Sequence, residues 1–263
     1  MKQQTKFSNI SFFTNSPTNS TKMIQTLKDK VSAVADLASV LSIDELLSAL
    51  VNQFPREVTF STSFSYEDQV ITHKILSNRL PVKIFTLDTG RLFPETYSVW
   101  RATNEKYDTR IKAYYPDAIS LENFVGEKGP NSFYESVENR KDCCYIRKVA
   151  PLKRVLKDNS IWITGLRAEH SADRHHIPQV EWDEGNNIIK YHPILHWTTE
   201  EVKQYINEND IPYNSLHDKG FVSIGCAPCT RAIRPGEDFR AGRWWWEDST
   251  KKECGLHVHQ QAL

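Results

Sequence analysis

The sequence predicts an α/β protein, a single domain with a mostly parallel twisted sheet flanked by helices. Short segments rich in β-branched and aromatic residues alternate with helical segments of about 10–15 residues, a pattern typical of parallel sheets with helices on both faces. Polar turns separate these segments. The chain has 263 residues, of which 39% are hydrophobic and 25% charged, so it is long enough and apolar enough to bury its own core.

The elements of the first half follow from hydrophobic periodicity. Residues 20–50 are expected to be largely helical, because apolar residues recur there at helical spacing. The segment EVTFS at 57–61 is predicted to be a strand, and residues 67–76 are predicted to be the helix after it. VKIFTL at 82–87 predicts a second strand, and a proline opens the helix predicted for 94–107.

The second half continues the alternation. A third strand is expected within 109–115, and residues 142–156 are predicted to be a helix despite an internal proline. SIWITG at 160–165 predicts another strand. A turn-like DEGN segment predicts a hairpin over 180–191, and a capping box opens the helix predicted for 198–208. Beyond it, frequent Gly, Pro and charged residues predict loops and a tail.

Charge and hydropathy exclude some classes of protein. Lys and Arg number 33, as do Asp and Glu, and this zero balance argues against a general nucleic-acid binder. No apolar run approaches the ~18–20 residues of a membrane helix. Residues 1–21 are polar and lack the pattern of a secretory signal. We therefore expect a cytoplasmic protein that binds neither nucleic acid nor membrane.

Polar turns follow three predicted strands, at residues 61–68, 88–91 and 165–174. Because the carboxyl ends of parallel strands meet at one edge of a sheet, we expect these turns to converge and to bind a nucleotide there. The first turn, STSFSYED, leads into a helix N-terminus, which favours an anion. Leu87 can offer backbone polar groups to a base, and Arg167 can donate paired hydrogen bonds to sulfate or phosphate. Each turn alone is also explained as a connecting loop, and Arg167 as an ordinary surface arginine.

Four of the five cysteines occur in two pairs. The cysteines are Cys143, Cys144, Cys226, Cys229 and Cys254. In a reducing compartment, paired cysteines indicate a metal site or catalysis more often than disulfides. The two pairs supply the four thiolates that a [4Fe–4S] cluster needs. Zinc is the alternative metal, although adjacent cysteines at the start of a helix suit zinc poorly. Buried free thiols with a chance C-x-x-C spacing are the simpler alternative.

Cationic residues occur near the fifth cysteine and near the first cysteine pair. Arg240 and Arg243 are three residues apart and can converge on one anion, and three tryptophans follow at 244–246. Cys254 is flanked by two lysines and a histidine, which favour its thiolate form. Lys148 follows Cys144 by four residues, so the two lie on the same helix face. Its charge can offset that of a cluster or reach an anionic substrate. An unimportant tail cysteine is the alternative for Cys254.

Taken together, these segments resemble the assimilatory sulfonucleotide reductases, specifically the cluster-containing branch that acts on adenosine 5′-phosphosulfate (APS). The resemblance spans about residues 58–257, and the presence of both cysteine pairs favours APS over its 3′-phosphorylated form, PAPS. The motifs that carry it, in chain order, are LDTGRLFPETY at 87–97, CCYIRK at 143–148, ITGLR at 163–167, SIGCAPCTR at 223–231, PGEDFRAGRWWWE at 235–247 and KECGLH at 252–257.

The resemblance implies a fold similar to the adenine nucleotide alpha hydrolases (PP-loop-like), divided into a polar N-terminal tail (1–21), the reductase domain (22–240) and a mobile C-terminal catalytic tail (241–263). It implies one [4Fe–4S] cluster per chain on Cys143, Cys144, Cys226 and Cys229, and a nucleophile at Cys254. The substrate-binding residues that it implies are Ser61, Ser63, Leu87, Lys148, Gly165, Arg167, Arg240, Arg243 and His257.

The function that the resemblance implies is reduction of APS to sulfite and AMP through an S-sulfocysteine at Cys254. Thioredoxin or glutaredoxin is the expected reductant, and a homo-oligomer is left open. An ATP-dependent tRNA sulfurtransferase of the PP-loop type is one alternative, but the turn at 61–68 lacks its glycines and the chain lacks a basic excess. A non-enzymatic iron–sulfur redox sensor is another, but no basic helix-turn-helix pattern is present.

Overall fold

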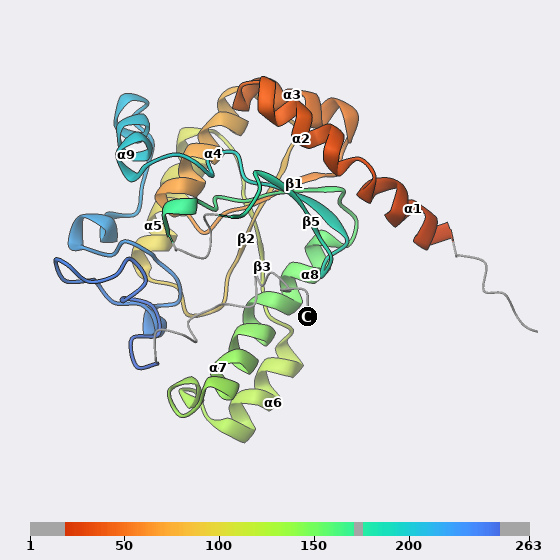
Figure 1. The fold of residues 1–263 in the computed structure, drawn as a ribbon. Helices are drawn as coiled ribbons and strands as arrows, with labels where there is room; N and C mark the ends of the chain where they lie inside the picture. Colours follow the sequence, from red (N-terminus) through yellow and green to blue (C-terminus); the bar gives the residue numbers. More distant parts are fainter. Residues whose placement is uncertain (1–18, 171–175, 248–263) are drawn as a thin grey trace, which may run out of the picture.

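The computed structural model describes residues 19–170 and 176–247 (Figure 1). These residues form one six-stranded sheet in the order β3-β2-β1-β4-β6-β5. All neighbouring strands are parallel except β5, which forms an antiparallel hairpin with β6. The strands are β1 (Val58–Ser61), β2 (Lys83–Leu87), β3 (Lys112–Tyr114), β4 (Ile161–Ile163), β5 (Val180–Asp183) and β6 (Ile188–Tyr191). The mostly parallel sheet and the terminal hairpin that the sequence predicts are thus confirmed.

Helices lie on both faces of this sheet (Figure 1). The α-helices are α1 (Asn19–Lys28), α2 (Val31–Val40), α3 (Ile43–Gln53), α4 (Tyr66–Ser77), α5 (Pro94–Lys106), α6 (Ala118–Lys128), α7 (Val137–Cys144), α8 (Ala150–Leu156) and α9 (Thr199–Glu208). A π-helix, η2 (Tyr145–Val149), joins α7 to α8. Short 3-10 helices are η1 (Ser132–Tyr134), η3 (Ala168–His170), η5 (Ser215–Lys219) and η6 (Ala227–Cys229).

The helix boundaries differ from the predictions in two places. The predicted helical region over 20–50 is three helices, and Ser42 begins the third of them with a complete capping box to Glu45. The predicted helix over 142–156 begins earlier, at Val137, and changes to π-helix before α8. Pro151 lies in the first turn of α8, directly after the π-helix, and cannot donate the backbone hydrogen bond that a continuous helix makes at that position. Helix α6 was not predicted.

The two faces of the sheet differ in chemistry. One face carries Phe60, Ile163 and Ile189, which pack with buried residues of α3, α4 and α9 in the largest apolar cluster. The opposite face carries Trp162, which packs on α8, and beside it the buried Lys190. This alternation arises because successive side chains of a strand point to opposite faces. The apolar face supplies the core, and the opposite face leads toward the candidate site.

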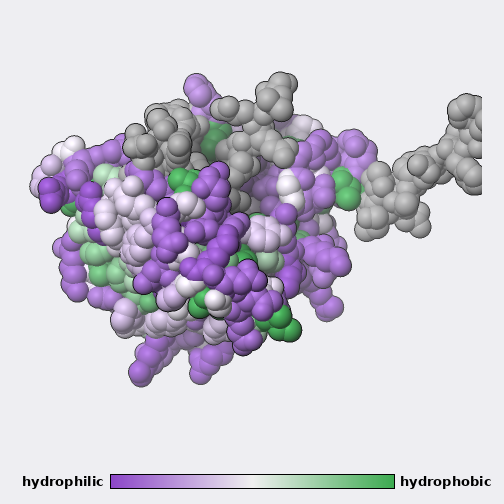
Figure 2. All heavy atoms as spheres, turned by 90° about the horizontal axis from the view of Figure 1, so that it is seen from below, coloured by the Kyte–Doolittle hydropathy of each residue, from purple (hydrophilic) through white to green (hydrophobic). Residues whose placement is uncertain are grey.

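The exposed surface is largely polar in the view of Figure 2, with apolar residues scattered singly. Among residues 19–170 and 176–247, no helix is long and apolar enough to span a bilayer.

Candidate active site

A cavity of about 260 Å³ opens where the sheet's central strands end. Its wall includes residues that follow β1, β2 and β4, so the predicted convergence of the three turns is confirmed for the described residues. We call it the main cavity. Seven of the nine predicted substrate-binding residues line it: Ser61, Ser63, Leu87, Lys148, Gly165, Arg240 and Arg243.

The turn after β1 is held in shape by its own side chains. Asp68 Oδ2 accepts hydrogen bonds from Ser63 N (2.5 Å) and Ser63 Oγ (2.7 Å). Thr62 Oγ1 accepts from the amide of Phe64, which adopts a positive φ of 60°. Burial raises the pKa of Asp68 to about 6. The hydroxyl of Ser63 therefore helps to hold the turn as well as lining the main cavity.

The turn after β2 connects the main cavity to the cysteines. Asp88 Oδ1 accepts from Gly90 N (2.8 Å) and from the hydroxyl of Tyr97 (3.0 Å). The turn so formed places Thr89 Oγ1 3.3 Å from Cys226 Sγ. The carbonyl of Thr89 accepts from the buried guanidinium of Arg147 at 2.5 Å. Because Thr89 also lines the main cavity, one residue touches both regions.

The turn after β4 contributes backbone, while its arginine points elsewhere. Gly165 lies so close to Asp68 that an added Cβ would be 2.2 Å from the carboxylate, so only glycine fits. The side chain of Arg167 is 1% exposed and is not in the wall of the main cavity. Its guanidinium binds Glu67 at 2.9 Å, Glu169, and Thr199 at 3.0 Å on α9. This geometry does not support the predicted contact of the Arg167 side chain with the phosphosulfate.

One end of the main cavity is cationic. Lys148, Arg240 and Arg243 line it beside Trp244, over whose ring the Arg243 guanidinium lies at 4.8 Å. Gly225 packs against Arg243, and a Cβ there would be 2.5 Å from Nη2. Guanidinium and ammonium groups are well suited to the oxygens of a phosphosulfate.

A ring stack anchors the segment that precedes residues 222–225 to helix α4. His217 of η5 stacks on Tyr66 at the start of α4, with 3.9 Å between ring centroids. His217 Nδ1 donates to the carbonyl of Phe221 at 2.7 Å, and burial lowers the histidine pKa. The stack holds the chain just before residues 222–225, which line the main cavity.

The four paired cysteines lie together. Cys143, Cys144, Cys226 and Cys229 line one small cavity of about 20 Å³, which we call the cysteine cavity. Burial raises the pKa of Cys143 and raises that of Cys229 to about 12. A buried thiol with a raised pKa is a poor nucleophile, so Cys143 and Cys229 suit a structural or metal-binding role better than catalysis.

The residues around the cysteine cavity decide which metal group it can hold. Within the described ranges, no three His, Cys, Asp or Glu side chains are arranged to hold a single metal ion. The four thiols nevertheless share one cavity, and Arg91, Arg140, Arg147 and Lys148 also line it. Four sulfur donors with cations beside them fit an anionic multi-iron cluster, which spaces its ligands farther apart than one zinc ion does.

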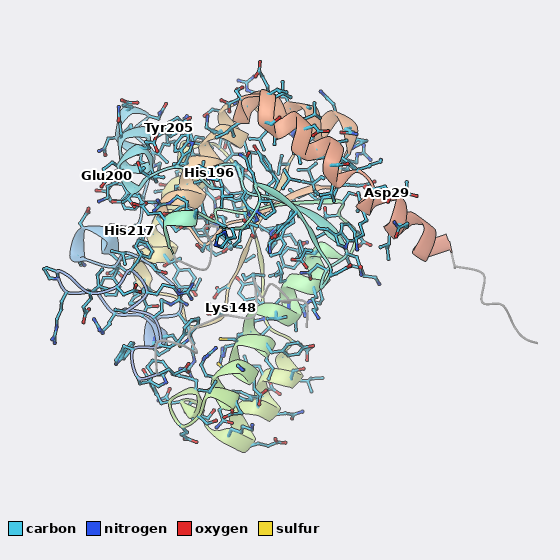
Figure 3. The ribbon with its side chains drawn as sticks, in the orientation of Figure 1. Asp29, Lys148, His196, Glu200, Tyr205 and His217 are labelled. Atoms are coloured by element: carbon cyan, nitrogen blue, oxygen red, sulfur yellow. The ribbon has the colours of Figure 1, made fainter. Side chains whose placement is uncertain are left out.

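Lys148 lies in the wall of both cavities. In Figure 3 it lies between the sheet above and helices α6 and α7 below. A cation in this position acts electrostatically on both regions. The sequence predicted Lys148 from its spacing to Cys144, but it gave no sign that Thr89 and Arg147 also join the two regions. The only sequence signals for these two residues are that Thr89 follows Asp88 and that Arg147 precedes Lys148.

The predicted nucleophile Cys254 and the predicted His257 lie outside the described residues. The last described residue, Glu247, pairs with Arg140 of α7 at 2.7 Å, and both side chains are almost fully buried. The chain is therefore fixed beside the cysteine cavity, seven residues before Cys254.

The chain is similar to known proteins of one family. A family model described as the phosphoadenosine phosphosulfate reductase domain matches residues 57–232. The chain is 48% identical to the adenosine 5′-phosphosulfate reductase of Burkholderia cepacia, over 84% of this chain and 88% of that protein. It is 49% identical to the protein of the same name from Rhizobium meliloti, over 81% of each chain.

Solved structures show the same fold. The crystal structure of phosphoadenylyl-sulfate (PAPS) reductase from Candida auris, in a phosphate complex, matches with a TM-score of 0.66 and 30% identity, over 78% of this chain and 97% of that one. The FMN adenylyltransferase of Candida glabrata in complex with ATP matches at a TM-score of 0.50 and 15% identity, over 80% and 76% of the two chains, a likeness of fold alone.

Proposed function

This chain belongs to the phosphoadenosine phosphosulfate reductase domain family, and we propose that it reduces APS to sulfite and AMP. The observation that carries the proposal is the position of Lys148 in the wall of both cavities, which joins a cationic anion-binding site to four clustered cysteines. The relatives at 48% and 49% identity carry the name adenosine 5′-phosphosulfate reductase, which supports APS as the substrate.

The reaction has two steps. The Cys254 thiolate attacks the sulfur of APS, the bond between that sulfur and the bridging phosphate oxygen breaks, and AMP leaves with the electron pair. Cys254 then carries an S–SO₃⁻ group. A reductant dithiol attacks the Cys254 sulfur and expels sulfite, and its second thiol resolves the mixed disulfide to regenerate Cys254.

The cationic end of the main cavity serves the first step. Negative charge develops on the bridging oxygen as AMP departs, and Lys148, Arg240 and Arg243 line the cavity where that charge forms. Their side chains come from the π-helix η2 and from the segment before Glu247, so the site depends on the packing of these two segments.

The cysteine cavity is proposed to hold one [4Fe–4S] cluster, with Cys143, Cys144, Cys226 and Cys229 as ligands. When bound, the cluster supplies a local charge that tunes the electrostatics of the adjacent site without cycling its redox state. Arg147, which is buried and binds the Thr89 carbonyl, contributes positive charge against the thiolates.

The tether from Glu247 to Cys254 is long enough for attack. Seven residues span at most about 25 Å when fully extended. Because Glu247 is fixed beside the cysteine cavity, this reach covers the adjoining main cavity. We propose residues 241–263 as the catalytic tail, of which Arg243, Trp244 and Glu247 are packed beside the two cavities, with 22–240 as the reductase domain and 1–21 as an N-terminal tail. We also propose thioredoxin or glutaredoxin as reductant and the cytoplasm as the compartment.

The test is to trap the intermediate. Protein incubated with ³⁵S-labelled APS and no reductant is expected to carry label on the peptide that contains Cys254, and added thioredoxin is expected to release it as sulfite. The Cys254→Ser variant is expected to keep its iron and bind AMP but form no adduct. Label on another residue, or sulfite formation by that variant, would contradict the proposal.

A further inference from the structure

A ladder of polar side chains crosses the sheet beneath the main cavity. Trp162 of β4 is in register with Lys190 of β6, which is in register with Glu181 of β5. Lys190 Nζ is 3.4 Å from both Glu181 Oε1 and Asp183 Oδ2, and it lies 5.0 Å from the centroid of a Trp162 ring. Lys190 is 2% exposed, so a charged group has been buried across three strands. Such burial is costly unless the group is paired, as it is here.

The ladder ends at a residue of the main cavity. Trp162 Nε1 donates to Ser61 Oγ at 2.9 Å, and both residues line the main cavity. His192 connects Glu181 to Thr164 in the same way, because it lies 3.3 Å from the Glu181 carboxylate and 2.6 Å from the Thr164 hydroxyl. Thr164 also lines the main cavity. The edge carboxylate thus supports two side chains in the cavity wall.

The bond from Trp162 fixes the hydrogen-bond direction of Ser61. An indole N–H can only donate, so Ser61 Oγ must accept. Within the described residues, Ser61 Oγ has no other hydrogen-bond partner. Its own proton is therefore available to an acceptor in the main cavity. The Lys190 ammonium over the indole face withdraws electron density from the ring, which strengthens the N–H as a donor.

We propose that Trp162 is a positioning residue for nucleotide binding, which fixes Ser61 as a donor toward an acceptor atom of the nucleoside. The acceptor is either a ring nitrogen of the adenine or an oxygen of the ribose. The inference rests on the proposed function in one respect, that the main cavity takes an adenine nucleotide. It assigns a role to the buried Lys190 and Trp162 that the chemistry at Cys254 does not require.

The test measures AMP binding by calorimetry to the iron-loaded protein. Ser61→Ala is expected to weaken binding about tenfold, since one neutral hydrogen bond is lost. Trp162→Phe keeps an aromatic ring but removes the N–H, and is expected to weaken binding by about three- to tenfold. Because Trp162 acts through Ser61, the double variant is expected to bind AMP no more weakly than Ser61→Ala alone.

Analogues of AMP identify the acceptor. The probes are 1-deaza-, 3-deaza- and 7-deaza-AMP for the ring nitrogens, and 2′-deoxy- and 3′-deoxy-AMP for the ribose. The native protein is expected to bind one of them about tenfold more weakly than AMP, and both single variants are expected to lose that discrimination. A merely structural role for Trp162 would weaken binding of all the nucleotides alike.

The chain offers a matched control. Trp100 of α5 is also largely enclosed, stacks on Phe64, and its Nε1 has no hydrogen-bond partner among the described residues. Trp100→Phe is therefore expected to change AMP affinity by less than about twofold. If Trp162→Phe fails to fold, benzothienylalanine at position 162 keeps the indole shape with sulfur in place of N–H.

The possible results separate the two proposals. This inference alone would be overturned if a folded Trp162 variant kept the native AMP affinity and the native discrimination between AMP and its analogues. It would also be overturned if the loss of affinity in the double variant equalled the product of the losses in the two single variants. Native protein that binds no AMP would overturn the proposed function and this inference with it. Native protein that binds AMP but forms no adduct at Cys254 would overturn the proposed chemistry and leave this inference standing.

Discussion

The sheet region and the cysteine region are held together by different forces. We define the sheet region as β1–β6 with α2, α3, α4 and α9, and the cysteine region as residues 137–149 with 222–247. The largest apolar cluster belongs to the sheet region, with residues such as Leu47 and Phe60 completely buried. The cysteine region buries thiols and the charged Arg140 and Arg147.

This difference predicts which region depends more on a bound group. Apolar burial stabilises the sheet region whatever is bound. In the cysteine region, four thiols line one cavity and Arg147 Nε is buried without a hydrogen-bond partner among the described residues. Unpaired buried polar groups are costly, so a group bound at the thiols is expected to stabilise this region. The candidate site therefore borders the region that is expected to depend more on a bound group.

The largest effect is expected from removing a cysteine. Cys226→Ser is expected to lose the iron and to lower sulfite formation by at least about a hundredfold, because the group that the cysteine region needs is lost. The sheet region is expected to stay folded. Iron analysis, visible absorbance and far-ultraviolet circular dichroism check this. Collapse of the whole fold would show that the two regions are not separable.

The buried ion pair of the cysteine region comes next. Arg140→Met leaves the Glu247 carboxylate buried without its partner and is expected to lower the free energy of unfolding by about 3–5 kcal/mol. Denaturant titration measures it. The control is the double variant Arg140→Met/Glu247→Leu, which removes both charges and is expected to recover much of the loss. A loss under about 1 kcal/mol would mean that the pair does not anchor the segment before Cys254.

The pH dependence of the sheet region is expected to reflect Asp68. Burial raises its pKa from 3.8 to about 6, so between these values the folded protein binds more protons than the unfolded one. The contribution of Asp68 to stability is therefore fully present below pH ~4 and falls by about 3 kcal/mol as pH rises through 6. The contribution is isolated by measuring the unfolding free energy of the native protein and of Asp68→Asn at pH 4.5 and 7.5, and by subtracting the variant's value from the native value at each pH. A difference that rises with pH would contradict it.

The smallest effect is expected at a helix cap far from both cavities. Ser42→Ala removes the capping box of α3 and is expected to cost about 1 kcal/mol of unfolding free energy. Iron content and AMP affinity are expected to stay unchanged, since α3 packs in the apolar cluster of the sheet region and contributes no residue to the wall of either cavity. Loss of iron in this variant would show that the two regions are coupled through the core.

The strands could be predicted because their signals are local. In EVTFS and VKIFTL, apolar residues alternate with polar ones or follow one another, and turn residues flank each segment. In the structure, β1 and β2 start one residue after the predicted starts and end at the predicted ends. The capping box of the helix at 198–208 was likewise predicted and is present at Thr198 and Glu201. Helix α6 was missed because it buries little, Phe124 being its only buried residue, and so its apolar periodicity is weak.

The sequence by itself determined the alternation of strands and helices, the cysteine pairs and the motifs of the family, because each of these depends on neighbours along the chain. Only the tertiary structure decided that Arg167 pairs with Glu67 while Lys148 lies between two cavities, and that Trp162 holds Ser61. The pairs Arg167–Glu67 and Trp162–Ser61 each join residues about 100 positions apart in the sequence. Which buried charge finds which partner depends on how the elements pack, and hydrophobic periodicity carries no information about that.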